Sequence, residues 1–299
     1  MFTGLSAFPL TPLADDAVDE AAFTGLVRRL SAAQVDSITA LGSTGSYAYL
    51  STEERARVAH LAVEHAGDIP VFIGIGALRT SHVLTHLEHA QEAGASAVLL
   101  APTTYQPLTD DDVFGLFDTV TAHSSVPVIV YDNPTTTHVT FTTELYGRIG
   151  QLPGIASLKI PAVPADPQQA RARVREIRAV LPQHVSIGIS GDATAAAGLA
   201  AGCDAWYSVL AGTLPGPALR ITRAALDGRV DEAEAESGRL APLWGLFAEF
   251  GSLRVVAAVA ECLDLVPQAC LPLPLHGLND EQRAQVARIV DDLGLDRQR

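Results

Sequence analysis

The chain has 299 residues, of which 48% are hydrophobic and 18% are charged. That balance supplies a sizeable buried core and excludes an intrinsically disordered protein. The formal net charge of −14 disfavours a nucleic-acid partner, and no apolar run reaches the roughly 18 residues that a bilayer-spanning helix needs.

The start of the chain and its cysteines bear on the cellular compartment. No secretory leader precedes Phe2-Thr3-Gly4-Leu5. The three cysteines, Cys203, Cys262 and Cys270, form neither a metal-binding spacing nor an even disulfide framework. We therefore expect a cytoplasmic protein that does not act at a membrane.

Short apolar runs alternate with amphipathic stretches along the first three quarters of the chain. The runs typical of buried strands are residues 5–8, 37–41, 71–75, 97–101, 128–131, 155–160, 185–189 and 205–209. Helical patterns lie between them at residues 20–33, 52–66, 81–93, 110–123, 142–150, 166–180 and 193–201. Two of these helices begin with a capping residue and an acidic first turn, at Ser51 and at Thr109.

Eight strands alternating with helices predict a (β/α)₈ TIM barrel, which we assign to residues 1–225. From about residue 215 the strand pattern stops. Helical patterns at residues 217–226, 231–250, 253–263 and 280–293 predict a C-terminal helical domain over residues 226–299. The alternative is an open doubly wound sheet. It is disfavoured because Gly74-Ile75-Gly76 lacks the third glycine of a dinucleotide-binding loop.

The composition of basic residues is unusual, because Lys159 is the single lysine beside 19 arginines. Arginine stays protonated, whereas a buried lysine can lose its proton and attack a carbonyl to form a Schiff base. Lys159 lies near the end of the apolar run 155–160, which favours burial. A coding bias that left one lysine in a structural ion pair explains the composition equally well.

Other reactive groups follow the predicted strands, at the end where TIM barrels place their active sites. Residues 42–46 (Gly-Ser-Thr-Gly-Ser) offer hydroxyl and backbone N–H donors suited to a carboxylate or phosphate. Tyr131 and Lys159 end successive strands, so we expect them side by side. An amine, a phenol and a carboxylate-binding loop suffice for imine chemistry on a 2-oxo acid. An ordinary Gly/Ser loop and a barrel-rim aromatic are the alternatives.

These motifs resemble the dihydrodipicolinate synthase / N-acetylneuraminate lyase family of Schiff-base aldolases. Residues 42–45 resemble its carboxylate loop G-[ST]-T-G, and residues 131–134 its Y-N-x-P motif, with Asp132 in place of the usual Asn. Residues 157–159 resemble its lysine-bearing strand. Residues 190–192 and 202–209 resemble its S-G-D and G-x-x-G-x-I-S-V segments. The match is in register along nearly the whole chain.

The resemblance implies a TIM barrel with a C-terminal helical domain and a pyruvate-dependent class I aldolase, or lyase. Lys159 would form the imine, which requires no cofactor and no metal, and Tyr131 would relay protons. Ser43 and Thr44 would bind the carboxylate of the 2-oxo acid, and Thr44 is also counted among the catalytic residues. The partners would be pyruvate and an aldehyde, in a homotetramer or homodimer. The expected substrate-binding residues are Ser43, Thr44, Gly45, Thr136, Gly191 and Tyr207. Packing at the barrel rim is the alternative role for Tyr207.

Two departures from the lysine-biosynthesis branch of the family bear on the substrate. Thr136 stands where that branch has an arginine for its second substrate's carboxylate. Thr103-Thr104-Tyr105 stands where it has a tyrosine that reaches the neighbouring subunit, so this tyrosine is missing or displaced. We therefore favour a 2-keto-3-deoxy sugar acid as substrate. The alternatives are a 4-hydroxy-tetrahydrodipicolinate synthase, an imine-forming dehydratase, and a catalytically inactive pyruvate-binding sensor.

A possible metal site arises from three histidines with helical spacing. His82, His86 and His89 stand at i, i+4 and i+7 of a predicted helix, a spacing that can bind a metal. The helix belongs to the outer ring, and no carboxylate shares the face. We therefore expect ordinary surface histidines and no metal.

Overall fold

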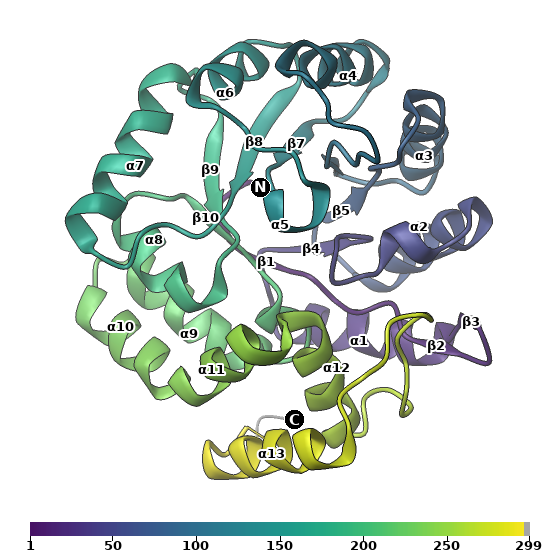
Figure 1. Cartoon of the computed structure of the whole chain (residues 1–299), viewed down its shortest axis with the longest axis vertical. Helices are drawn as coiled ribbons and strands as arrows, with labels where there is room; N and C mark the ends of the chain where they lie inside the picture. Colours follow the sequence, from purple (N-terminus) through teal and green to yellow (C-terminus); the bar gives the residue numbers. More distant parts are fainter. Residues whose placement is uncertain (296–299) are drawn as a thin grey trace.

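In the computed structural model, which describes residues 1–295, eight parallel strands close into a barrel (Figure 1). Around the barrel they are β1 (Gly4–Ala7), β4 (Ser37–Ala40), β5 (Val71–Gly74), β6 (Ala97–Leu100), β7 (Val128–Tyr131), β8 (Ile155–Ile160), β9 (Ser186–Ile189) and β10 (Ala205–Ser208). β1 pairs in parallel with both β4 and β10, which closes the sheet. The predicted TIM barrel is confirmed, and the open sheet is excluded.

An outer ring of helices surrounds the strands (Figure 1). The helices are α1 (Glu20–Ala32), α2 (Thr52–His65), α3 (Thr80–Glu92), α4 (Asp110–His123), α6 (Thr143–Gly150), α7 (Pro167–Val180), α8 (Ala195–Ala200) and α9 (Pro215–Leu226). The predicted start signals are confirmed, because Ser51 and Thr109 each form a capping box with the acidic residue three positions later.

The barrel interior is filled by side chains rather than left as a pore. Phe8, Phe72, Ile129, Tyr131 and Tyr207 belong to one buried apolar cluster inside the strands. At the N-terminal end, the ring of Phe2 stacks on Phe72 with a centroid separation of 5.4 Å. With this end filled, the mouth at the carboxyl ends of the strands is the place for a ligand.

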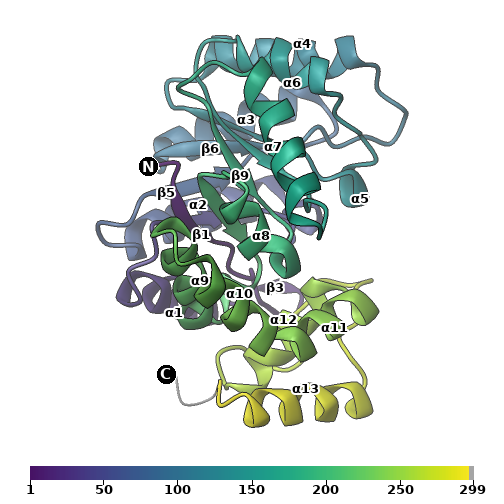
Figure 2. The ribbon, with the colours of Figure 1, turned by 90° about the vertical axis from the view of Figure 1, so that its left-hand side faces the viewer.

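Four helices follow α9: α10 (Val230–Arg239), α11 (Ala241–Phe250), α12 (Ser252–Cys262) and α13 (Asp280–Asp292). Helices α11–α13 lie together on one side of the barrel (Figures 1 and 2). Helix α10 packs on α8 and α9, so the division at residues 225 and 226 stays a prediction. Residues 296–299 of the predicted C-terminal domain lie outside the described residues.

The single helix predicted over residues 231–250 is wrong. It is two helices, α10 and α11, that meet at Leu240. Pro242 lies in the first turn of α11. Its ring nitrogen cannot donate to a carbonyl four residues earlier, and its ring would clash there, so a continuous helix is broken at this point.

Several short elements at the strand ends were not predicted from the sequence. They are the hairpin β2–β3 (Leu13–Ala14 and Ala17–Val18), the 3₁₀ turns η1 (Tyr47–Tyr49), η2 (Asp192–Thr194) and η3 (Leu210–Gly212), and the single-turn helix α5 (Pro134–Thr137). Within residues 1–295, no helix combines the length and the apolar character needed to cross a membrane.

Candidate active site

Lys159 and Tyr131 lie side by side at the mouth of the barrel, as their strand positions predicted. The two residues are register partners on β8 and β7. The Nζ atom of Lys159 lies 3.7 Å from the ring centroid of Phe8 and 3.9 Å from that of Tyr131. Gly42 makes room for this arrangement, because a Cβ atom there would come within 2.6 Å of the Phe8 ring.

The surroundings of Lys159 favour its neutral form. The side chain is 2% exposed, and burial lowers its pKa to about 7, although the negative charge of Asp192 acts in the opposite direction. A lysine with this pKa has a large fraction of free amine near neutral pH. Such an amine is a nucleophile toward a carbonyl carbon.

The Tyr131 hydroxyl is held between two polar side chains. It lies 3.0 Å from Ser43 Oγ, and Asn133 Nδ2 donates to it over 2.7 Å. Burial raises the pKa of Tyr131 to about 12, so the phenol keeps its proton at neutral pH. Because Asn133 occupies the oxygen as a donor, the phenol proton is directed to Ser43 or to a ligand in the cavity.

A cavity of about 500 Å³ opens above Lys159. Residues from three parts of the chain line it. The loop after β4 contributes Ser43, Thr44, Ser46, Tyr47 and Tyr49, and other strand ends contribute Thr103, Asn133, Thr135, Thr136 and Ser190. The C-terminal part contributes Ser252, Leu253 and Leu275. Among the lining residues that the structure describes, Lys159 is the one charged side chain. The wall is therefore mostly hydroxyl groups, with an apolar patch at the C-terminal side.

Comparison with known proteins shows the family of the chain. The model of the dihydrodipicolinate synthetase family matches residues 1–293. The chain belongs to that family. It is therefore a lyase of the Schiff-base, class I aldolase type, from a family that uses pyruvate.

Relatives and solved structures cover most of the chain. The 4-hydroxy-tetrahydrodipicolinate synthase of Hyphomonas neptunium is 34% identical over 243 residues, which are 80% of this chain and 81% of the relative. A dihydrodipicolinate synthase structure from Agrobacterium tumefaciens is 42% identical, with a TM-score of 0.94 and 98% of both chains covered. A chloride-inhibited dihydrodipicolinate synthase from Acinetobacter baumannii, solved with pyruvate, is 25% identical, with a TM-score of 0.88 and coverage of 99% and 100%.

Five of the predicted site residues of this family member meet in the cavity: Ser43, Thr44, Tyr131, Thr136 and Lys159. Gly45 and Gly191 adjoin the cavity without lining it. A Cβ atom at Gly45 would lie 3.0 Å from the backbone nitrogen of Leu41, and one at Gly191 would lie 2.5 Å from Ala162 Cβ. Both positions therefore require glycine for close packing of the loops that carry the site.

The structure does not bring Tyr207 to the cavity. Its hydroxyl is 2.7 Å from Ser157 Oγ inside the barrel, and its ring meets Phe8 edge to face with centroids 6.1 Å apart. Phe8 in turn contacts Lys159. Tyr207 therefore packs one layer below the amine, as in the packing role considered from the sequence.

Two buried carboxylates flank the site but do not line the cavity. Asp132 accepts a hydrogen bond from the Tyr146 hydroxyl on α6, and Asp192 accepts from Trp206 Nε1 over 2.8 Å and from the backbone nitrogen of Leu210 over 3.1 Å. Burial raises the pKa of each aspartate to about 6. They act on the site through position and charge rather than by contact with a ligand in the cavity.

Several lining residues were not identified from the sequence. Asn133 belongs to the recognised motif, but its contact with Tyr131 depends on the turn into α5. Tyr47 and Thr103 form a second hydroxyl pair in the cavity, with 2.8 Å between their side-chain oxygens. The position of Tyr47, directly after the Gly-Ser-Thr-Gly-Ser loop, was the available signal.

The three histidines lie on α3 and do not form a metal site. His86 is buried, and its pKa is lowered to about 4 by burial and by the positive charge of Arg55. His82 is exposed. Across residues 1–295, no group of three or more histidine, cysteine, aspartate or glutamate side chains gathers as metal ligands.

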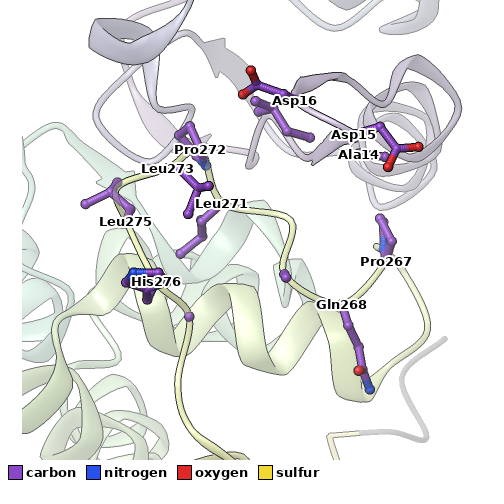
Figure 3. A pocket seen from close by; sticks show the side chains of 13 residues that line it. Ala14, Asp15, Asp16, Pro267, Gln268, Leu271, Pro272, Leu273, Leu275 and His276 are labelled. Atoms are coloured by element: carbon purple, nitrogen blue, oxygen red, sulfur yellow. The ribbon is translucent and has the colours of Figure 1, made fainter.

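A second cavity of about 420 Å³ lies beside the barrel (Figure 3). There the turn of the β2–β3 hairpin, at Asp15 and Asp16, faces residues 267–277. Leu275 borders both this cavity and the one above Lys159. The lining of this second cavity, as far as the structure describes it, holds neither an amine nor a phenol, so this cavity cannot perform imine chemistry.

Proposed function

We propose that the protein cleaves a 2-keto-3-deoxy sugar acid, or a related 2-oxo acid, to pyruvate and an aldehyde through an imine on Lys159. The observation that carries this proposal is the lining of the cavity beyond the amine. It offers neutral hydroxyls and, among its described residues, no cation besides Lys159. Neutral donors and acceptors suit a polyhydroxylated chain better than a second carboxylate.

The first step joins the amine to the substrate. The neutral Nζ of Lys159 attacks C2 of the 2-oxo acid, and the carbinolamine hydroxyl takes up a proton and leaves as water while the nitrogen lone pair forms the C=N bond. Tyr131 and Ser43 supply and remove these protons, because their hydroxyls lie 3.0 Å apart. We therefore assign proton transfer with Tyr131 to Ser43 rather than to Thr44. Thr44 and the loop's N–H groups bind the carboxylate of the 2-oxo acid.

Cleavage then breaks the bond between C3 and C4. The 4-hydroxyl passes its proton to Tyr131, whose phenol gave up its own proton to the departing water, and the O–H electron pair forms the aldehyde C=O. The C3–C4 pair becomes the C2=C3 bond of an enamine, and the iminium π pair returns to nitrogen. Protonation at C3 and hydrolysis of the imine release pyruvate and the free Lys159 amine. The reaction needs no cofactor.

The second candidate is 4-hydroxy-tetrahydrodipicolinate synthase, because relatives at 26–34% identity carry that name. Condensation with aspartate semialdehyde brings a second carboxylate to the mouth of the cavity. Thr136, which lines that mouth, is short and neutral. It cannot replace the bidentate contact that an arginine makes with a carboxylate.

The two candidate functions are distinguished by comparing kcat/KM for sugar-acid cleavage with kcat/KM for condensation of pyruvate with aspartate semialdehyde. We expect pyruvate release from one or more 2-keto-3-deoxy acids to exceed condensation with aspartate semialdehyde. Thr136→Arg should lower the first value and raise the second. A value of about 10⁴ M⁻¹s⁻¹ or above with the semialdehyde would restore the biosynthetic assignment. Consumption of a sugar acid without pyruvate release would indicate a dehydratase.

A further inference from the structure

Tyr47 is a second phenol in the wall of the cavity above Lys159. It opens the 3₁₀ turn η1, directly after the Gly-Ser-Thr-Gly-Ser loop, and its side chain is 9% exposed. Tyr47 lines the same cavity as Lys159 and Tyr131. A buried phenol that borders a ligand cavity is placed to donate a hydrogen bond to whatever occupies it.

Two contacts fix the position of this phenol, and a neighbouring glycine leaves room for them. Its hydroxyl lies 2.8 Å from Thr103 Oγ1. The guanidinium of Arg55 lies 5.2 Å from its ring centroid, and donates over 2.9 Å to the carbonyls of Gly74 and Gly76 at the end of β5. A Cβ atom at Gly76 would lie 3.3 Å from both the Tyr47 and the Thr103 hydroxyl oxygens, so glycine leaves room for the pair.

Tyr105 does not supply a phenol to this cavity within the chain. Its side chain is 86% exposed, and it is not among the lining residues. Thr103, two residues earlier, turns toward the cavity and contacts Tyr47. The segment after β6 therefore contributes a hydroxyl that holds Tyr47 rather than a tyrosine of its own.

We propose that Tyr47 is a further catalytic residue, which donates a hydrogen bond to the oxygen on C4 of the substrate while Thr103 holds the phenol in place. Negative charge develops on that oxygen as its proton leaves and the C3–C4 bond breaks. A donor that is held in a fixed position stabilises such charge. The adjacent positive charge of Arg55 strengthens the phenol as a donor. The inference rests on the proposed function, because it needs a substrate with an oxygen at C4.

The role of Tyr47 is confined to the aldehyde half of the reaction, which makes it separable from imine formation. Pyruvate alone has no C4 oxygen, so its capture by Lys159 does not use this donor. The test therefore measures two quantities on each variant: the pyruvate concentration for half-maximal borohydride trapping, and kcat/KM for pyruvate release from the sugar acid.

The variants are Tyr47→Phe, Thr103→Val, Thr103→Ser and, as a matched control outside the cavity, Tyr105→Phe. In Tyr47→Phe we expect trapping within about twofold of the wild type and cleavage lowered about 100-fold, the effect of losing one such donor. Thr103→Val should show a smaller loss of cleavage, and Thr103→Ser should retain wild-type values. Tyr105→Phe should change neither quantity.

Tyr47→Phe cleavage within about threefold of the wild type would overturn the role, as would an equal loss of trapping and cleavage. A loss in Tyr105→Phe instead would assign the donor to a neighbouring subunit. If the wild type condenses aspartate semialdehyde and cleaves no sugar acid, the role of Tyr47 is tested by comparing pyruvate trapping with the rate of that condensation in the same variants. A loss there supports Tyr47 although the proposed substrate is wrong. A wild type that traps pyruvate but converts neither substrate would overturn both.

Discussion

The amine of Lys159 and the ring of Tyr131 face each other from paired positions on adjacent strands, with 3.9 Å between Nζ and the ring centroid. The backbone fixes this relationship. The N–H of Asp132, directly after Tyr131, donates to the carbonyl of Lys159 over 3.0 Å. The amine and its neighbouring phenol are therefore held by the sheet rather than by a mobile loop.

Burial of Lys159 should set the pH dependence of imine formation, and the charge of Asp192 should shift it. In the proposed mechanism the free amine of Lys159 is the nucleophile, so trapping should rise about tenfold from pH 6 to pH 8, for a pKa of about 7. Asp192 raises that pKa. Asp192→Asn should therefore move the midpoint of the trapping profile to lower pH. The exposed Asp68→Asn is the control for the same change in formal charge. A midpoint that stays in place or moves upward would refute the coupling.

The Tyr131–Ser43 hydroxyl pair should act as one unit in proton transfer. Tyr131→Phe should lower kcat by ~10²–10⁴, the usual contribution of a positioned acid/base. Ser43→Ala should lower it as well, and the double variant should lose little more than Tyr131→Phe alone, because the two hydroxyls share one path. Steady-state kinetics of the four proteins test this, with circular dichroism to check the fold. Additive losses would mean that the two hydroxyls work independently.

Thr44 should bind the carboxylate of the 2-oxo acid. It is buried and lines the same cavity as Lys159. A charge-assisted hydrogen bond contributes on the order of 1.5–3 kcal/mol, so Thr44→Val should raise the pyruvate concentration for half-maximal trapping at least tenfold. Thr136→Val, at the outer mouth, should leave pyruvate trapping unchanged. An unaltered titration in Thr44→Val would move the carboxylate elsewhere.

Asp132→Asn should stabilise the fold above pH 6. Burial raises the pKa of Asp132 to about 6, so the carboxyl favours the folded state when protonated, and that contribution is lost as the pH rises through 6. Asparagine stays neutral and keeps an acceptor for the Tyr146 hydroxyl. We expect a gain of up to about 3 kcal/mol in the free energy of unfolding at pH 8, which vanishes near pH 4. Urea unfolding at both pH values checks this. A variant less stable at pH 8 would contradict it.

The sequence predicted the parts of the site that depend on strand ends. Parallel strands in a closed barrel end at the same face, so Tyr131 and Lys159 had to meet once their two runs were identified as neighbouring strands. The same logic placed residues 42–46 near them. The sequence did not determine the side-chain directions in this loop. The structure brings Ser43 rather than Thr44 into contact with Tyr131.

The remaining residues depend on local turns that leave no periodic pattern. Tyr47 reaches the cavity because Ser46 takes a left-handed conformation (φ 52°) and a 3₁₀ turn follows. Leu253 and Leu275 reach it from helices and loops more than 90 residues after Lys159. Tyr207 was expected at the substrate, but its side chain is one layer deeper in the barrel. A local turn decides the position of Tyr47, and tertiary packing decides the positions of Leu253, Leu275 and Tyr207.

The central claim is that Lys159 forms a covalent imine with pyruvate. Borohydride reduction of the wild-type protein with millimolar pyruvate, followed by intact-mass and peptide mass spectrometry, tests it directly. We expect one reduced pyruvate adduct per chain, located on Lys159, and none in Lys159→Arg or Lys159→Ala. A wild-type protein that gains no adduct, or an adduct that persists in these variants, would contradict the account.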